Sequence, residues 1–255
     1  MLLNRILVTL LLSAALSVSF GQTPLRVAAA ADLEPVLPRI LTQFERDLGV
    51  HAEATYQASA ALTTQIQNGA PFDVFLSADL SYPKRLIDAG LADSPTPIIY
   101  AMGTLVLWAR KDSKLPPPSV ELLRYPGLRR LAVANPDRAP YGRAAVAALT
   151  SLKIYNAVKS RLVTAENIAQ AAQFVDSGNA DAGLISLTSA LTERLSRSGN
   201  YFVIPRDLYS PIDQGAVVLK HTSQGPAAHK LLDYLLTAPV QAQLAKAGLT
   251  PVRAK

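Results

Sequence analysis

Short runs of small or polar residues stand where strands are expected to give way to helices. They are Ala30-Ala31-Asp32, Ala58-Ser59-Ala60, Ser77-Ala78-Asp79 and Ala139-Pro140-Tyr141-Gly142. The first backbone N–H groups of a helix have no partner within it and carry partial positive charge, so converging helix ends bind an anion without lysine or arginine. Small side chains let the backbone come within hydrogen-bond distance of the ligand. Together with a fifth helix start near Asn167-Ile168, this pattern indicates a site for a small anion.

Each junction taken singly also has a purely structural explanation, because serine and aspartate are common N-cap residues. Capping accounts for Ser59 and Asp79, and Tyr141 could be a turn residue with its hydroxyl in water. Asp32 and Asp79 could in principle serve acid–base chemistry, but capping is again the commoner role at a helix start. No G-x-S-x-G elbow, Walker loop or H-E-x-x-H motif occurs in the chain. The sequence therefore favours a binding protein over an enzyme.

Composition excludes several kinds of protein and of site. Of the 255 residues, 49% are hydrophobic and 17% charged, which is unlike a disordered chain. The absence of cysteine excludes zinc–thiolate sites, iron–sulfur clusters and a lipid anchor on cysteine, and the three histidines stand far apart. The net charge is +6, but the longest basic cluster, Arg129-Arg130, is too short for a nucleic-acid-binding stripe. We therefore expect no cofactor, no direct metal ligand and no nucleic-acid partner.

The N-terminus has the pattern of a secretion signal over residues 1–21. A basic Asn4-Arg5 precedes the mostly apolar run 6–16, and Ser19-Phe20-Gly21 offers small residues at the cleavage positions. The run is shorter than the roughly 20 apolar residues that span a membrane. Later apolar runs are interrupted by charges or prolines. We expect an exported protein in the bacterial periplasm.

Beyond the signal, strands alternate with helices and must position the junctions. The predicted strands are 25–30, 51–56, 73–76, 130–134, 161–163, 182–186, 201–204 and 216–220. The predicted helices are 33–47, 60–67, 80–89, 142–152, 166–177, 189–196, 224–236 and 239–247. This order predicts two α/β lobes with mostly parallel sheets, joined by crossing segments near 98–109 and 203–217. We divide the chain into a discontinuous first lobe (22–102 and 216–255) and an inserted second lobe (103–215) that close on a ligand about a hinge.

At several places the sequence resembles the periplasmic molybdate-binding proteins of bacterial ABC importers. The resemblance is carried by VAAAADLEPVL (27–37), QASAALTTQIQNGAPFDVFLSAD (57–79), YAMGTLVLWARKDS (100–113), NPDRAPYGRAA (135–145), ENIAQAAQFVDSGNADAGLISLT (166–188) and GPAAHKLLDYLLTAPVQAQLAKAGL (225–249). It implies the type II periplasmic-binding-protein fold. It also implies that molybdate or tungstate is held between the lobes as the oxyanion, by neutral donors only, and passed to membrane permease subunits. We expect a monomer.

The resemblance also implies which residues bind. The Ser59 hydroxyl and the Ala78 backbone match donors at the second and third junctions, Tyr141 matches the donor of the inserted lobe, and Ile168 matches a backbone donor. Ala31 and Asp32 belong to the first junction. Ser186 stands where some members place a tyrosine hydroxyl, and a serine is shorter.

Position 32 departs from the family, which usually has serine or asparagine there. A carboxylate about 4 Å from a unit negative charge costs about 4 kcal/mol at an effective dielectric of about 20, and a dianion doubles this cost. A micromolar site is worth about 8 kcal/mol. Three arrangements are compatible with binding. Asp32 turns away and caps its own helix through the Glu34 amide, it is protonated in the complex, or the ligand is a protonated anion such as hydrogen phosphate, which a carboxylate accepts. We expect the first, because capping is the commonest role of aspartate at a helix start.

Overall fold

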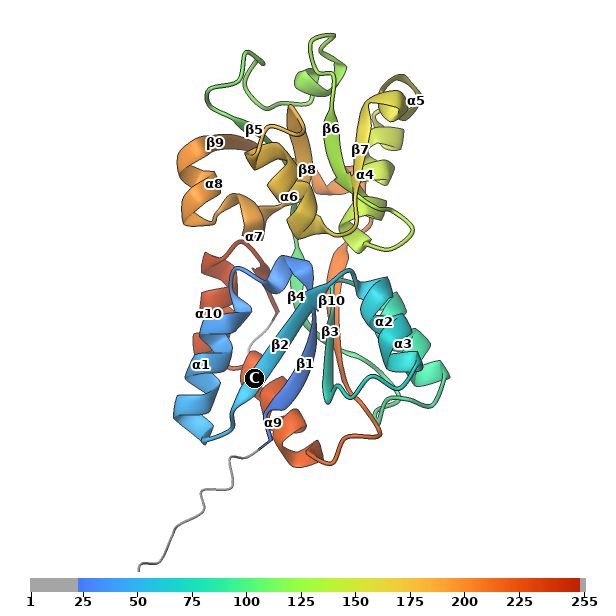
Figure 1. Cartoon of the computed structure of the whole chain (residues 1–255), viewed down its shortest axis with the longest axis vertical. Helices are drawn as coiled ribbons and strands as arrows, with labels where there is room; N and C mark the ends of the chain where they lie inside the picture. Colours follow the sequence, from blue (N-terminus) through green and yellow to red (C-terminus); the bar gives the residue numbers. More distant parts are fainter. Residues whose placement is uncertain (1–22, 253–255) are drawn as a thin grey trace, which may run out of the picture.

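Two sheets, one in each lobe, organise the chain. The structure is a computed structural model that describes residues 23–252, and the predicted secretion signal lies outside these residues. The first sheet has the order β11-β4-β10-β3-β1-β2 and the second has the order β7-β6-β8-β5-β9. The strands of the first sheet are β1 (Leu25–Ala30), β2 (Ala52–Gln57), β3 (Val74–Ser77), β4 (Ile98–Gly103), β10 (Ile212–Val218) and β11 (Thr250–Pro251). Those of the second are β5 (Leu105–Arg110), β6 (Leu131–Ala134), β7 (Leu162–Ala165), β8 (Ala182–Ser186) and β9 (Gly199–Val203). Figure 1 shows the lobes stacked along the long axis.

Helices flank both sheets (Figure 1). Around the first sheet lie α1 (Leu37–Leu48), α2 (Ser59–Gln67), α3 (Ser81–Asp88), α9 (Gly225–Leu235) and α10 (Ala238–Lys246). Around the second lie α4 (Pro140–Ser151), α5 (Tyr155–Val158), α6 (Ile168–Asp176), α7 (Leu187–Ala190) and α8 (Glu193–Ser198). Short 3-10 segments are η1 (Ala31–Leu33), η2 (Glu121–Arg124), η3 (Lys159–Arg161) and η4 (Arg206–Leu208). No helix among residues 23–252 has both the length and the apolar character needed to cross a membrane.

Parallel pairing brings the functional junctions to common edges. Strand β1 pairs in parallel with both β2 and β3, and β6 pairs in parallel with both β7 and β8. The other pairs are antiparallel, so both sheets are mixed and the prediction of mostly parallel sheets was wrong. The carboxyl ends of parallel strands lie at one edge of their sheet, which is where ligands bind in open α/β sheets. The segments that follow β1, β2, β3, β6 and β7 therefore start at the edges that the two lobes turn toward each other.

The crossing segments differ in detail from the sequence-based expectation. Residues 98–109 are not one crossing segment but two strands in different sheets, β4 and β5, with Thr104 between them. The predicted strand 216–220 begins four residues earlier, at Ile212, because β10 pairs antiparallel with β4 as far as Gly103. The lobe boundaries themselves remain our proposal from the sequence.

Two helical predictions are also corrected. The first helix begins at Leu37 rather than Leu33, after the short 3-10 turn η1. Proline lacks an N–H and favours the first turn of a helix, so Pro35 and Pro38 shift the start of α1. The predicted helix 189–196 is two helices, because α7 ends at Ala190 and the Thr192 hydroxyl accepts a hydrogen bond from the Leu195 amide at 3.4 Å to begin α8.

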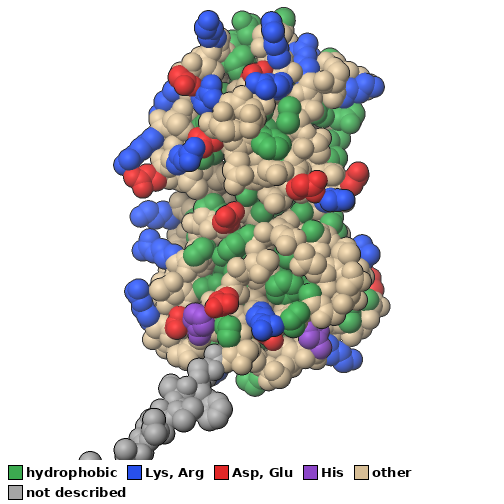
Figure 2. Space-filling view, in the orientation of Figure 1, with side chains coloured by type: hydrophobic (Ala, Val, Ile, Leu, Met, Phe, Trp, Pro, Cys, Tyr) green, Lys and Arg blue, Asp and Glu red, His purple; other side chains and the backbone are tan. Residues whose placement is uncertain are grey.

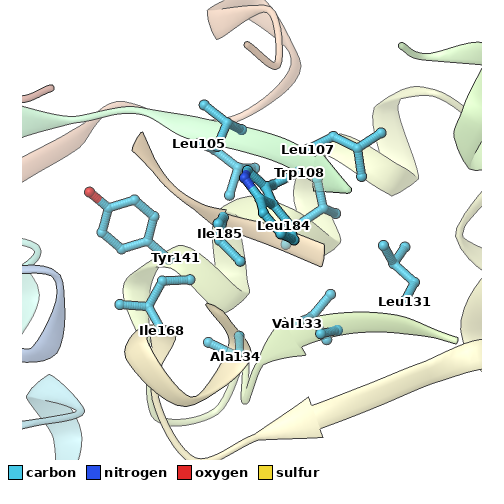
Figure 3. Packing of buried hydrophobic residues seen from close by; sticks show 14 of the residues in the cluster. Leu105, Leu107, Trp108, Leu131, Val133, Ala134, Tyr141, Ile168, Leu184 and Ile185 are labelled. Atoms are coloured by element: carbon cyan, nitrogen blue, oxygen red, sulfur yellow. The ribbon is translucent and has the colours of Figure 1, made fainter. Parts of the chain in front are cut away.

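Each lobe has an apolar core of its own. In the second lobe Trp108 is fully buried and its indole donates to the Leu195 carbonyl at 3.3 Å. In the first lobe α1 buries Leu37, Ile40 and Phe44 against the sheet. Figure 3 shows Tyr141 at the margin of the second-lobe cluster, with its hydroxyl directed away from the apolar side chains. This orientation takes a polar atom from the core of one lobe to the boundary with the other.

Candidate functional site

A small cavity lies where the two lobes meet. It is narrow, because the space open to the centre of a water-sized molecule is about 10 Å³, about that of a single water. Its lining consists of Ala30, Ala31, Asp32, Gln57, Ala58, Ser59, Ala78, Ala139, Pro140, Tyr141, Asn167 and Ile168. These residues belong to the starts of η1, α2, α4 and α6 and to the turn before α3. The convergence of helix starts that the sequence indicated is therefore present.

All of the predicted binding residues except Ser186 line this cavity. Ala31, Asp32, Ser59 and Ala78 come from the first lobe, and Tyr141 and Ile168 come from the second. Ser186 caps α7 instead, since its Oγ accepts from the Ser189 amide at 3.2 Å and from the Thr188 hydroxyl at 2.8 Å. The Ser186 hydroxyl is engaged in hydrogen bonds within the second lobe and does not line the cavity, as its shorter side chain had suggested.

Ser59 and Ala78 contact each other at the cavity wall. The Ala78 N–H donates to Ser59 Oγ at 3.2 Å, and Ser59 is 1% exposed. A hydroxyl that accepts still has its own proton to donate. Ser59 is the first residue of α2, whose cap position is Ala58, so the capping explanation for Ser59 is wrong.

The second lobe presents a capped helix start. Asn167 precedes α6 and its side chain accepts from the Gln170 amide at 2.9 Å. This hydrogen bond uses an amide deeper in the first turn and leaves the Ile168 N–H among the helix-start amides that have no partner within the helix. Ile168 is 3% exposed and lines the cavity. Its backbone is therefore placed to donate toward a ligand.

The carboxyl group of Asp32 does not cap its helix, and our preferred expectation for it was wrong. The Glu34 amide donates to the Ala31 carbonyl at 3.3 Å, not to Asp32. Asp32 Oδ2 accepts from the Tyr141 hydroxyl at 3.1 Å and from Gln214 Nε2. These two donors hold the carboxyl group at the cavity wall, in place of the expected turn toward the helix.

Burial dominates the electrostatics of the site. It raises the pKa of Asp32 from 3.8 to about 6, against hydrogen bonds from Gln214, Tyr141 and the Asp32 backbone, which lower it. Burial, and then the charge of Asp32, holds the pKa of Tyr141 well above its usual value. The pKa of Tyr100 is raised for the same two reasons. Both tyrosines therefore remain neutral hydrogen-bond donors at physiological pH.

Further contacts join the lobes beside the cavity. Arg143 on α4 forms an ion pair with Asp79, and its guanidinium also donates to the Tyr82 hydroxyl at 3.1 Å. Asp79 additionally accepts from the Tyr82 amide in the first turn of α3 at 3.2 Å, although the cap position of that helix is Leu80. The Ala60 amide donates to the Arg138 carbonyl across the boundary at 3.2 Å. The structure thus shows the lobes in contact around the cavity.

Neutral hydrogen-bond donors and helix N-termini, not charged side chains, supply the positive electrostatic potential inside the cavity. Among its lining residues there is no lysine or arginine, and Asp32 is the ionisable acid. Within residues 23–252 no group of three His, Cys, Asp or Glu side chains could hold a metal ion. Figure 2 shows Lys and Arg side chains distributed over both lobes on the face it presents. Such a cavity can bind an oxyanion through hydrogen bonds.

Three residues that shape the site escaped the sequence analysis. Gln214 lies fully buried in the hinge strand β10, between Asp32 and the Tyr100 hydroxyl, which donates to Gln214 Oε1 at 2.8 Å. A Cβ at Gly103 would lie 2.3 Å from the Tyr141 hydroxyl, so this glycine makes room for the tyrosine. The usable signal was a glutamine two residues before the predicted apolar strand 216–220, because a buried amide needs polar partners.

Comparisons with known proteins identify the family of the chain. The family model of bacterial extracellular solute-binding proteins matches residues 25–250. The molybdate-binding protein ModA of Azotobacter vinelandii is 40% identical over 210 residues, 82% of this chain and 83% of the relative. The ModA protein of Rhodobacter capsulatus is 35% identical over 82% of this chain and 81% of its own.

Solved structures confirm the predicted two-lobe fold. The periplasmic molybdate-binding protein of A. vinelandii superimposes with a TM-score of 0.85 at 31% identity, covering 90% of this chain and all of its own. The sulfate-binding protein SubI of Mycobacterium tuberculosis, at 20% identity and a TM-score of 0.77, shares the fold over 90% of this chain and 87% of its own. The chain belongs to the bacterial extracellular solute-binding proteins, and the relatives it resembles most strongly among those described above are molybdate-binding proteins.

Proposed function

We propose that this protein captures molybdate or tungstate in the interlobe cavity and delivers it to the permease of an ABC importer. The observation that carries the proposal is the convergence of helix starts from both lobes on a small interlobe cavity whose lining residues include no lysine or arginine. The relatives named molybdate-binding proteins support the choice of anion. The protein would be a carrier with no cofactor and no catalytic group.

The proposed ligand contacts are neutral donors. The Ser59 hydroxyl and the backbone amides near Ala31 and Ile168 line the cavity, and Ala78, whose N–H donates to Ser59 Oγ, holds that hydroxyl in place. Each of the helices α2, α4 and α6 has nine or more residues, and a helix N-terminus acts like about half a positive charge. Three such termini, with hydrogen bonds from both lobes, would offset much of the charge of a dianion. Tyr141 lines the cavity, but its one hydroxyl proton is donated to Asp32, so its proposed role is to position Asp32 and not to donate to the anion.

Size would distinguish molybdate and tungstate from sulfate. All three are tetrahedral dianions, so charge and hydrogen-bond pattern do not separate them, and the dimensions of the closed cavity must. Because the ligand contacts come from both lobes, an anion of the wrong size would leave donors of one lobe without partners. Buried donors that lose their partners cost about 1–3 kcal/mol each.

Calorimetric titration of the mature chain tests the proposal. We expect binding heat with sodium molybdate and sodium tungstate and none with sulfate. Ser59→Ala removes a hydrogen bond to a charged ligand, worth about 1.5–3 kcal/mol, so we expect roughly 10- to 100-fold weaker molybdate binding. Ser186→Ala is the matched control, because Ser186 is buried outside the cavity and should leave affinity unchanged. Absence of heat with both metal oxyanions would refute the proposal.

A second candidate is a receptor for a protonated anion such as hydrogen phosphate. It is favoured by Asp32 Oδ1, a buried oxygen with no hydrogen-bond partner among the described residues, which could accept the ligand's proton. In that case Asp32→Ser would weaken phosphate binding and improve molybdate binding. Tight molybdate binding by the wild-type protein without measurable phosphate binding would exclude this candidate.

The remaining parts of the proposal concern location and partners. Residues 1–21 would direct export to the periplasm and be removed, and the mature chain would act as a monomer that docks on permease subunits in the inner membrane. N-terminal sequencing of the periplasmic protein tests the cleavage site. A mature N-terminus upstream of residue 21 that keeps the apolar run 6–16 would contradict it.

A further inference from the structure

The carboxyl group of Asp32 has one saturated and one unpartnered oxygen. Oδ2 accepts from the Tyr141 hydroxyl and from Gln214 Nε2. Oδ1 is buried and has no hydrogen-bond partner among the described residues. The residue is 0% exposed and lines the anion cavity. A buried polar atom that lacks a partner in a ligand cavity indicates that the ligand, or a proton shared with it, is meant to satisfy it.

The neighbouring residues fix which oxygen can carry a proton. Tyr100 donates to Gln214 Oε1 at 2.8 Å, and this orients the amide so that its NH₂ group faces Asp32. Tyr141 supplies the second donor to the same oxygen. A proton on Oδ2 would compete with both donors, whereas a proton on Oδ1 meets neither. The network therefore accommodates a neutral Asp32 whose O–H is on Oδ1.

No lysine or arginine among the described residues that line the cavity compensates an ionised Asp32 beside an anion. The titratable groups around it are Tyr141 from α4, Tyr100 from β4 and, beside Tyr141, Tyr209. The charged side chains at the lobe boundary are paired with each other, as Arg143 with Asp79 and Arg138 with Glu166 at 2.8 Å. A carboxylate and a dianion in this cavity would repel each other at short range in a medium that screens poorly.

We propose that the cavity binds its oxyanion together with one proton, which is taken from solvent and held on Oδ1 of Asp32. In this form the carboxyl group donates to a ligand oxygen and acts as a neutral donor like the others. The ligand keeps its two charges and the protein loses one, so the site as a whole takes up one proton per dianion. Tyr141 and Gln214 are positioning residues that hold Oδ2 and direct Oδ1 to the cavity. This inference rests on the proposed function and adds that capture depends on pH.

The direction of the pH dependence follows from proton linkage. Burial raises the pKa of Asp32 to about 6, so near pH 7.5 the ligand-free protein is mostly ionised at this residue. A dianion next to the group raises that pKa further, and the proton is therefore acquired on binding. Above the pKa of the ligand-free protein, the dissociation constant should rise about tenfold for each pH unit. Below that pKa it should level off.

Calorimetry of the mature wild-type protein with sodium molybdate, in two buffers of different ionisation enthalpy at about pH 7.5, counts the protons. We expect about one proton taken up per molybdate, and a dissociation constant about tenfold higher at pH 8 than at pH 7. Asp32→Asn, which mimics the neutral acid with its NH₂ group at the position of Oδ1, should bind with no proton uptake and little pH dependence. Asp79→Asn, at another carboxylate of the lobe boundary, should retain the uptake.

The outcomes separate this inference from the proposed function. Molybdate binding by the wild-type protein with zero proton uptake, or undiminished uptake by Asp32→Asn, would overturn proton coupling and leave the proposed function intact. The wild-type proton count needs no variant, and Asp32→Ser provides a second neutral side chain if the asparagine variant does not fold. Failure of the wild-type protein to bind molybdate or tungstate at any pH would refute the proposed function itself.

Discussion

Replacing Asp32 by asparagine should stabilise the ligand-free protein at neutral pH, although the residue is fully buried and hydrogen-bonded. The reason is that the ionised carboxylate has lost water, and the donors from Tyr141 and Gln214 do not fully restore its solvation. Asparagine keeps the shape of the side chain. Its carbonyl oxygen can accept from both donors, and its NH₂ group takes the position of Oδ1.

The magnitude follows from the pKa of Asp32 in the folded protein. A rise from 3.8 to about 6, at 1.36 kcal/mol for each pKa unit, corresponds to about 3 kcal/mol. Because the folded-state pKa is raised, the favourable contribution is fully present below about pH 4 and is lost as pH rises through about 6. Asp32→Asn does not titrate, so its advantage over the wild-type protein should grow from near zero at about pH 4 to about 3 kcal/mol at about pH 8.

Urea denaturation of both proteins at about pH 4, 5, 6, 7 and 8, without ligand, measures this difference directly. Asp88→Asn is the control, because Asp88 is exposed and pairs with Lys84 within one helix at 3.1 Å. It should change stability by no more than about 0.5 kcal/mol at any of these pH values. A stability difference between Asp32→Asn and wild type that stays constant with pH, or that favours the wild-type protein at pH 8, would refute the reasoning.

Three further substitutions test the network and the contact between the lobes. Gln214→Met removes a donor to the ionised Asp32, so the midpoint of the stability–pH profile should move above 6, and an unchanged midpoint would contradict the role of this amide. Gly103→Ala should lower the free energy of unfolding, measured by urea denaturation, by about 1–3 kcal/mol, because its Cβ would lie 2.3 Å from the Tyr141 hydroxyl. Gly225→Ala is the control and should lower it far less, because a Cβ there would meet nothing within 4 Å. Arg143→Ala removes a partly exposed interlobe ion pair, so molybdate affinity measured by calorimetry should fall about fivefold or less, and this loss should shrink at high salt. A loss of affinity beyond about a hundredfold would show that Arg143 has another role.

The alternation of elements could be predicted because it depends on local patterns. Strand β1 was predicted at its observed bounds, and α2 within one residue, because apolar periodicity and small residues at the junctions are read along the chain. Pro35 and Pro38, before and within the first turn of α1, move the start of that helix beyond the bound that apolar periodicity predicts. Errors concentrated at the hinge, where β4 passes into β5 after Thr104 and strand identity depends on pairing partners far away in sequence.

The candidate cavity could be anticipated from the parallel pairing of the strands. Parallel strands of one sheet present their carboxyl ends at one edge, so the junctions that contain Asp32, Ser59 and Ala78 had to lie together once the strand order was known. The contribution of the second lobe, through Tyr141 and Ile168, depended on the two lobes facing each other. That arrangement was expected from the likeness to a known family and not from spacing alone.

The sequence by itself determined the elements, the converging helix starts and the kind of ligand they suit, because backbone amides at helix ends need only local geometry. It also identified Asp32 as the residue in conflict with an anion. Only the tertiary structure decided what that residue does. Its partners, Tyr141 and Gln214, stand 109 and 182 residues away along the chain. The protonation and direction of a buried carboxyl group depend on which groups surround it in space, and no local pattern encodes contacts at that separation.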